Sequence, residues 1–385
     1  MKKIWCLAFL FTISLSLLAQ QQVINQKFTS KELYGVRDLK IYLPEGYKEE
    51  THNYPLAIVI DTDNLFNLYV ENAKLFASKD RAPKQVVVGI SLDKTKEEDI
   101  YYDKDTYRLT GGNVKFINFI KKEIISFIEK NYRISPFITI VGEGMAANII
   151  TAFLNEDTSL FNAYVCINPI FPPTITEKVS SYQVYRFGKE DNQFYYYLNN
   201  LPFYSKSEKK ALTMLKTYFN SLSAKNFHFK YDDMNSPNYL SAMSEAIPRA
   251  INVIFELYRG ISEKEYNEKI KNLSPQEAIA YLEKKYLEID YLFGVDLGIR
   301  IKDIYAIENI VIDREGGRYL LDFGEMIVNV YPKSHIGDYY IGLYYEKQNQ
   351  RDLALEYYKK AYGKMNDSDP KKELFYGNIK RLSGK

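Results

Sequence analysis

A short glycine-rich turn between an apolar strand and an apolar helix is the part of this 385-residue sequence best suited to chemistry. The strand is expected over Phe137–Val141, the turn over Gly142–Ala147 and the helix over Asn148–Leu154. Such a tight turn tolerates only small neighbours and presents its central side chain, which can attack an acyl group if it carries an oxygen or sulfur. The central residue here is Gly144, so the turn is predicted to lack a nucleophile.

The elements around this turn alternate between short strands and helices up to about Glu256. A half-exposed strand is predicted over Val36–Pro44, and apolar, β-branched strands follow at Leu56–Ile60, Val86–Ile90, Ile138–Val141 and Tyr164–Ile167. An amphipathic helix is predicted from Val114 to Tyr132. Because strands and helices alternate, right-handed crossovers and a mostly parallel sheet are expected. The sequence therefore predicts an α/β fold with helices flanking a central sheet.

The order and spacing of further residues resemble the putative-esterase family, which includes esterase D and enterochelin-esterase-like proteins. The segments that carry the resemblance, from Phe28 to Tyr258, are Arg37 with Tyr42-Leu43-Pro44, Tyr54-Pro55 before Asp61, Gly111-Gly112 before Phe116, Glu123, Tyr132-Arg133, the turn, and Phe161 with Asn168-Pro169. The resemblance implies the α/β-hydrolase fold. Family members read Gly-His-Ser-x-Gly-Gly at the turn, whereas this chain has Glu143 for the histidine, Gly144 for the serine, and alanines for the last two glycines.

The resemblance also implies a catalytic histidine in the loop after a late strand, which is predicted here over Phe227–Tyr231. Asn238 is the best match to that histidine, and an amide cannot act as a general base near neutral pH. The sequence places its three histidines elsewhere: His52 in a polar loop, His228 within the late strand and His335 in the helical C-terminal part. The family's catalytic triad of serine, histidine and an acid is therefore predicted to be degenerate at two positions, Gly144 and Asn238.

The remainder of the expected site is a cleft beside the turn. Glu190 or Asp191 follows a predicted strand and is a candidate for the triad acid, although a loop carboxylate is more often simply hydrated. Backbone amides near Thr62 and at Met145 are the expected oxyanion donors. The residues expected to line the cleft are Thr62, Asp63, Glu143 and Met145.

Two functions from different classes remain open. The first is a pseudo-hydrolase, an esterase-like scaffold that binds a small ligand in the residual cleft or a protein partner through its C-terminal helices. The second is an active carboxylic-ester hydrolase with a relocated nucleophile. In that case Glu143 would act as a base on water or Cys166 would attack, although free cysteine is commonly a small buried apolar residue. We expect no cofactor and no metal, because the scattered histidines have no ligand spacing.

The N-terminus predicts export. Lys2 and Lys3 precede the apolar run Ile4–Leu18, so residues 1–20 are expected to form a signal peptide. We expect a periplasmic or secreted protein without an integral membrane segment after cleavage. Only Cys166 would then remain, which excludes an intramolecular disulfide. Loss of the two lysines takes the formal net charge from +2 to about zero, which does not suit nucleic-acid binding.

The chain is expected to form two domains, an esterase-like domain over residues 21–260 and a helical domain over residues 261–385. In the second domain, the spacing of Ile341-Gly342, Tyr345, Ala354, Tyr358 and Ala361 is typical of a tetratricopeptide repeat and predicts one such hairpin over about residues 338–371. A single repeat cannot bury its own core, so an ordinary helical hairpin is the alternative. The chain is rich in tyrosine, with 35 residues, and paired tyrosines in this domain suit either a partner surface or helix packing.

Overall fold

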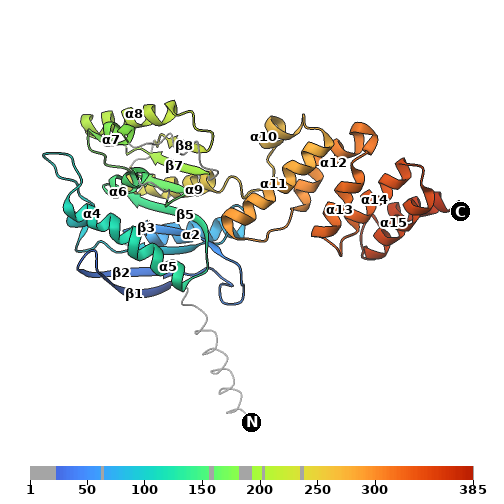
Figure 1. The fold of residues 1–385 in the computed structure, drawn as a ribbon, viewed down its shortest axis with the longest axis horizontal. Helices are drawn as coiled ribbons and strands as arrows, with labels where there is room; N and C mark the ends of the chain where they lie inside the picture. The colour runs from blue at the N-terminus through green and yellow to red at the C-terminus, as the bar shows by residue number, and fades with distance from the viewer. Residues whose placement is uncertain are drawn as a thin grey trace, which may run out of the picture. The chain divides into compact units, whose positions relative to one another are not determined.

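The computed structural model describes residues 23–61, 65–155, 160–181, 193–201, 204–234 and 238–384 (Figure 1). The chain divides into two compact units. The first, called the α/β unit, consists of Met1–Tyr258 and Tyr291–Val295, and the second, called the helical unit, consists of Arg259–Asp290 and Asp296–Lys385. The predicted signal peptide lies outside the described residues. Within the described ranges, no helix has the length and apolar character needed to cross a membrane.

The α/β unit is built on an eight-stranded sheet with the strand order β1-β2-β4-β3-β5-β6-β7-β8. Its strands are β1 (Val23–Ser30), β2 (Gly35–Tyr42), β3 (Tyr54–Ile60), β4 (Val86–Ile90), β5 (Ile134–Glu143), β6 (Ala163–Ile167), β7 (Phe194–Asn199) and β8 (Phe227–Asp232). The pairs β1–β2 and β2–β4 are antiparallel, and all other neighbouring strands are parallel. Every residue of β3, β4, β6 and β7 is buried, as expected for strands covered on both faces. The predicted mostly parallel sheet is confirmed.

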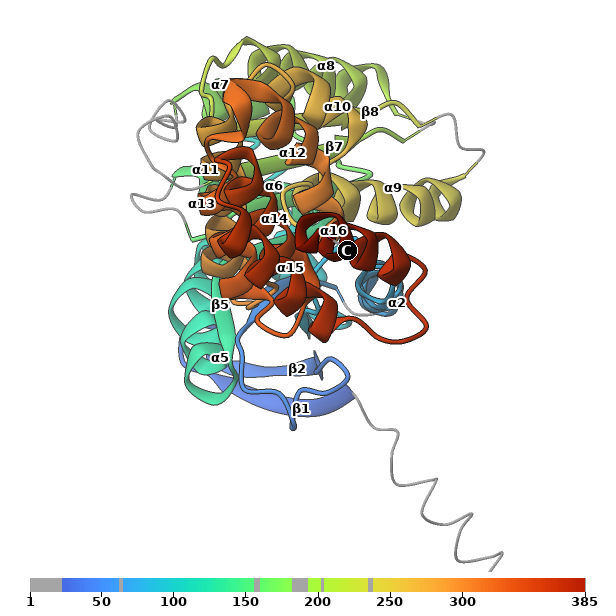
Figure 2. The same ribbon diagram turned by 90° about the vertical axis from the view of Figure 1, so that its right-hand side faces the viewer.

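Helices cover both faces of this sheet. One face carries α4 (Gly111–Asn118), the π-helical η2 (Phe119–Ile124), α5 (Ile125–Asn131), α6 (Ala146–Ala152) and α8 (Lys206–Ser221), and the other carries α2 (Leu65–Ser78) and α9 (Tyr239–Ile254). Shorter elements are α3 (Lys96–Ile100), η3 (Phe153–Asn155) and α7 (Ile175–Ser181). Figure 2 shows α5 and α2 on opposite sides of the sheet. The helix predicted from Val114 to Tyr132 is therefore one helical stretch whose middle is π-helical.

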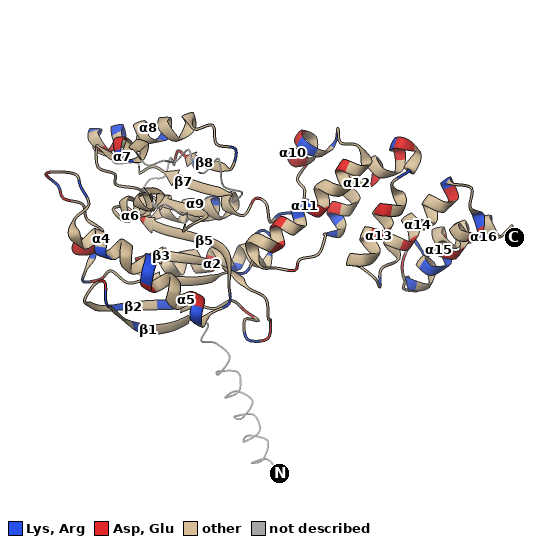
Figure 3. Cartoon of the chain, in the orientation of Figure 1, with Lys and Arg blue, Asp and Glu red and all other residues tan. Residues whose placement is uncertain are grey.

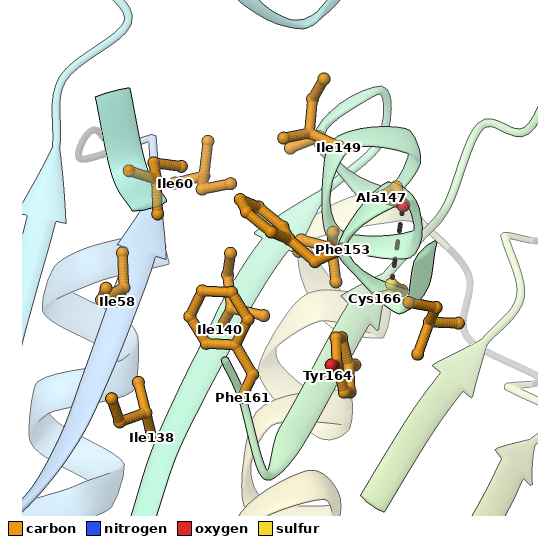
Figure 4. Packing of buried hydrophobic residues seen from close by; sticks show 14 of the residues in the cluster. Ile58, Ile60, Ile138, Ile140, Ala147, Ile149, Phe153, Phe161, Tyr164 and Cys166 are labelled. Carbon is orange, nitrogen blue, oxygen red and sulfur yellow. Dashed lines mark hydrogen bonds between the residues drawn. The ribbon is translucent and has the colours of Figure 1, made fainter. Parts of the chain in front are cut away.

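The core on the α6 side of the sheet consists of β-branched and aromatic side chains. Figure 4 shows Ile58 and Ile60 of β3 beside Ile140 of β5, with Phe153 and Phe161 packed close by. The two phenylalanine rings meet edge to face, with centroids 4.9 Å apart. Each such side chain, fully buried, contributes roughly 1.5–3 kcal/mol to folding. Because Phe153 directly follows α6, this packing holds the helix that begins at the glycine-rich turn.

The described part of the helical unit is built from helices of different lengths. They are α10 (Glu263–Glu265), η5 (Tyr266–Ile270), α11 (Pro275–Phe293), α12 (Ile301–Asp313), η6 (Arg314–Gly317), α13 (Leu320–Val330), α14 (His335–Lys347), α15 (Arg351–Lys364) and α16 (Lys372–Ser383). Helices α14 and α15 form a hairpin in which a Cβ at Gly342 would lie 2.8 Å from Cδ1 of Tyr358. Glycine at this position therefore permits the close approach of the two helices. That the hairpin is a tetratricopeptide repeat stays a prediction.

The two units do not meet at the single boundary after residue 260 that the sequence suggested. Tyr291–Val295, which includes the last turn of α11, belongs to the α/β unit. The reason is aromatic packing: Phe293 contacts Phe137 and Phe255, with ring centroids 5.1 and 5.5 Å apart. These apolar side chains come from distant parts of the sequence, so no local pattern indicates that they meet.

Candidate functional site

The glycine-rich turn has the sharp strand–turn–helix geometry that was predicted. Strand β5 ends at Glu143, α6 begins at Ala146, and Gly144 between them has a φ of +59°, in the left-handed region that favours glycine. The amide of Gly144 donates to the carbonyl of Ile167 at 3.0 Å, and its carbonyl accepts from the amide of Ile170, also at 3.0 Å. These two bonds fix the turn against the end of β6. We call the edge of the sheet formed by the carboxyl ends of β3 to β7 the elbow edge.

Gly142 and Gly144 differ in the space around them. A Cβ at Gly142 would lie 2.9 Å from both Cβ of Ala146 and Cδ1 of Ile150, so a side chain would displace α6. At Gly144 the nearest atom to a Cβ would be Cδ1 of Ile170, at an ordinary contact distance of 3.8 Å. The turn therefore has room for a side chain at Gly144.

Glu143, beside Gly144, is part of a polar network at the elbow edge. Its Oε2 accepts a hydrogen bond from Oη of Tyr239 at 2.7 Å. Burial raises the pKa of the Glu143 carboxyl, while the Tyr239 hydrogen bond and the charge of Lys96 act in the opposite direction. Lys96 itself pairs with Asp61, with Nζ and Oδ2 2.7 Å apart. Two carboxylates, a phenol and an ammonium group therefore lie at this edge.

Two fully buried asparagines complete the network at the ends of β6 and β7. The amide of Asn168 donates to Oδ1 of Asn199 at 2.7 Å, and Nδ2 of Asn199 donates to Oδ1 of Asn168 at 2.8 Å. Nδ2 of Asn168 also donates to the carbonyl of Tyr239 at 3.2 Å. Asn199 was not among the site residues predicted from the sequence. The signal that would have found it is an apolar strand, Phe194–Leu198, that ends in a polar residue.

The expected acid and part of the expected cleft cannot be placed, because Glu190, Asp191, Thr62 and Asp63 lie outside the described residues. Strand β7 begins at Phe194, after both acidic candidates in the chain, and its carboxyl end carries Asn199. In chain order Asn199 lies between Gly144 and Asn238, as a triad acid lies between the serine and the histidine. An uncharged amide therefore occupies this strand end.

Asn238 is the N-cap of α9. Its Oδ1 accepts a hydrogen bond from the amide of Ser241 at 3.0 Å, which stabilises the first turn of the helix. The next residue, Tyr239, reaches Glu143, so the start of α9 is close to the turn at Gly144. The loop selected from the sequence thus lies close to the turn at Gly144. The side chain of Asn238 in this loop caps the N-terminus of α9.

The two described histidines of the α/β unit lie away from this edge. His52 precedes β3 and His228 lies at the start of β8, so both are at the amino ends of their strands, opposite to the elbow edge. Nε2 of His228 lies 2.6 Å from Oε1 of Gln193. His335 belongs to the helical unit, where its ring meets that of Phe375 edge to face. Neither described histidine of the α/β unit therefore lies at the elbow edge beside Gly144.

Cys166 is a core residue. Its side chain is fully buried, and Sγ lies 3.4 Å from Oη of Tyr196 and 3.9 Å from the carbonyl of Ala147, the contact drawn in Figure 4. Burial raises the pKa of the thiol to about 12, and the reactive thiolate is therefore scarce at neutral pH. Cys166 is thus poorly suited to act as a replacement nucleophile.

Comparisons with known proteins agree with this architecture. Residues 30–216 match the model of the family described as "Putative esterase". An uncharacterised protein from Capnocytophaga ochracea has a similar structure, with a TM-score of 0.79 and 23% identity over 94% of this chain and 100% of that one. An IroE-like serine hydrolase from Shewanella oneidensis has a TM-score of 0.56 and 19% identity over 80% of this chain and 98% of that one. No curated protein matches the chain.

A third solved structure, the BES protein from Bacillus cereus, is similar to the chain with a TM-score of 0.54 and 18% identity. The similarity covers 61% of this chain and 95% of that one. At these identities the structural likeness establishes the fold, and the chemistry must be argued from the site itself.

Proposed function

We propose that this chain, whose residues 30–216 belong to the putative-esterase family of the α/β-hydrolase superfamily, has lost acyl-transfer chemistry and works as an exported binding protein. The observation that carries the proposal is the turn at Gly144. Its backbone geometry and the space for a side chain are retained, but there is no oxygen or sulfur to attack an ester. A protein that retains the scaffold without the nucleophile is suited to binding rather than to turnover.

Two asparagines at the elbow edge support the same proposal. Asn199 at the end of β7 and Asn238 at the start of α9 carry amides, which neither accept a proton nor stabilise an imidazolium by charge. Both side chains are committed to structural hydrogen bonds, Asn199 to Asn168 and Asn238 to the first turn of α9. We infer that the polar groups of the elbow edge now maintain the turn. A small ligand in the residual cleft or a protein partner of the helical unit would be what the scaffold binds.

The test is hydrolysis of short-chain p-nitrophenyl esters by the purified protein and by a Gly144→Ser/Asn238→His variant. The matched control is Gly144→Ala/Asn238→His, which carries the same backbone change without an oxygen. We expect no turnover by the natural protein or the alanine control, and measurable turnover by the serine variant. Any turnover by the natural protein would refute the loss of chemistry, and turnover that survives both Cys166→Ser and Glu143→Gln would also require a different active site.

Glu143 favours a second candidate, a carboxylic-ester hydrolase in which this carboxylate activates water directly. Burial raises the pKa of Glu143, and a carboxylate with a raised pKa is a better general base near neutral pH. In that case the natural protein would hydrolyse the same esters and Glu143→Gln would abolish turnover. Because glutamine retains an acceptor for Tyr239, the substitution removes the base with little change to the network.

A further inference from the structure

The helical unit contains a cavity of about 430 Å³ between α11, the loop that follows it, and α13. This volume lies within the range of sites that accommodate a drug-sized ligand or a few side chains of a partner. We call it the acidic cavity, defined by Glu283, Leu287, Asp290, Asp296, Met326 and Val330 among its lining residues. No residue named at the elbow edge lines this cavity.

One apolar residue of the acidic cavity is open to solvent. Leu287 on α11 is 70% exposed, whereas Met326 on α13, which also lines the cavity, is 7% exposed. Covering an exposed leucine with an apolar partner is favourable because it removes both surfaces from water. The cavity therefore offers an apolar contact that the chain itself does not complete.

The charged part of the acidic cavity has one sign. Glu283, Asp290 and Asp296 are its charged lining residues, and none of them makes a hydrogen bond or ion pair with any residue that the structure describes. Other carboxylates of the helical unit are paired: Glu346 lies 2.7 Å from Arg381, and Asp338 lies 2.5 Å from Lys364. Figure 3 marks the positions of acidic residues in red along the ribbon of α11. The unpaired carboxylates make the cavity complementary to a cation.

One wall of the acidic cavity is held in place by a buried network. Tyr286 lines the cavity, and its Oη donates to Oδ2 of Asp303 at 2.7 Å. Asp303 is 2% exposed and also accepts a hydrogen bond from the amide of Ile261 at 2.8 Å. A wall fixed in this way does not need to become ordered on binding, which lowers the entropic cost of association.

We infer that the acidic cavity binds a protein segment in which a bulky apolar side chain is flanked by lysine or arginine. The inference rests on the proposed function, because it names the chemistry of the partner that the helical unit would bind. The apolar side chain would cover Leu287, Met326 and Val330, while the cations would neutralise the three carboxylates. An acidic segment or a nucleic acid would be repelled by the same charges.

The test is fluorescence anisotropy with labelled peptides and the full, purified protein. The probe is a peptide with the core Lys-Leu-Lys-Phe-Lys. One control peptide has glutamate for every lysine, and another has serine for leucine and phenylalanine. We expect binding of the basic, apolar peptide alone, and weaker binding at higher salt because the charges of the cavity are exposed.

Variants of the lining locate the binding. Leu287→Ser should weaken binding about tenfold through loss of apolar contact, and Asp290→Asn/Asp296→Asn should weaken it about fivefold through loss of charge. The matched controls are Leu374→Ser and Glu373→Gln on α16, because Leu374 is 64% exposed and lies outside this cavity. Both controls should bind as the natural protein does. Thermal unfolding of every variant establishes that the fold is retained.

Three outcomes would overturn the inference. They are equal binding of the acidic or serine peptide, no binding of the basic, apolar peptide, and binding that the cavity variants leave unchanged. Self-association of the protein that Leu287→Ser abolishes would instead assign the cavity to a second copy of the chain. None of these results depends on ester hydrolysis, so failure here is distinguishable from failure of the proposed loss of chemistry.

Discussion

The elbow edge of the α/β unit and the acidic cavity of the helical unit treat their polar groups in opposite ways. At the elbow edge, Glu143 accepts a hydrogen bond from Tyr239, and Asn168 and Asn199 are hydrogen-bonded to each other. At the acidic cavity, three carboxylates have no partner among the described residues and surround an exposed leucine. Buried polar groups need hydrogen-bond partners within the protein, whereas exposed polar groups can be hydrated by solvent. The difference teaches that the polar groups of the elbow edge are used within the fold, whereas the carboxylates of the acidic cavity are exposed to solvent.

The strongest way to break this comparison is Asn199→Asp. The new carboxylate oxygen would face the Asn168 Oδ1 that now accepts a hydrogen bond from Asn199, inside a fully buried site. We expect the free energy of unfolding to fall by about 3 kcal/mol, whereas Asp290→Asn at the acidic cavity should change it by no more than about 0.5 kcal/mol. Thermal and urea unfolding followed by circular dichroism measures both. Equal stability of the two variants would show that the elbow edge is not a structural network.

A smaller effect separates the two glycines of the elbow edge. Gly142→Ala should lower the free energy of unfolding by about 2 kcal/mol, because the new methyl group would overlap Ala146 and Ile150. Gly144→Ala should cost only about 1 kcal/mol, from the left-handed backbone alone. The same unfolding measurements compare them. A larger loss at Gly144 would mean that the position has no room for a side chain, and would weaken the proposed recovery of activity by Gly144→Ser.

The smallest effect concerns the pH dependence of stability. Burial raises the pKa of Glu143 above its ordinary value of 4.5. The Glu143 carboxyl therefore binds its proton more tightly in the folded state than in the unfolded state. Stability should therefore fall as the pH rises from about 4.5 through the raised pKa, and Glu143→Gln should remove that loss.

Tyr239→Phe is the matched control for this experiment. The hydrogen bond from Tyr239 lowers the pKa of Glu143, so its removal should increase the loss of stability with rising pH. Unfolding curves across mildly acidic and neutral pH test both variants. If the natural protein and Glu143→Gln lose stability in parallel, the carboxylate is not desolvated by its surroundings.

Much of the α/β unit could be predicted because its signals are local. Buried strands such as Val86–Ile90 are short apolar runs, and the predicted bounds of that strand coincide with β4. The turn at Gly144 was predicted because its small residues lie between a strand and a helix in the sequence itself. Strand β7 was missed as a site element because Asn199 acquires its role only when β6 and β7 pair and bring it to Asn168.

The sequence by itself determined the α/β class, the position of the turn, and the absence of a nucleophile at Gly144, because these depend on residue types and short spacings. Tertiary structure alone decided that Glu143 meets Tyr239, that Cys166 is buried in the core, and that Tyr291–Val295 belongs to the α/β unit. It also decided that α11 and α13 enclose a cavity with unpaired carboxylates. These features depend on contacts between residues far apart in the chain, and local periodicity carries no information about which distant side chains will meet.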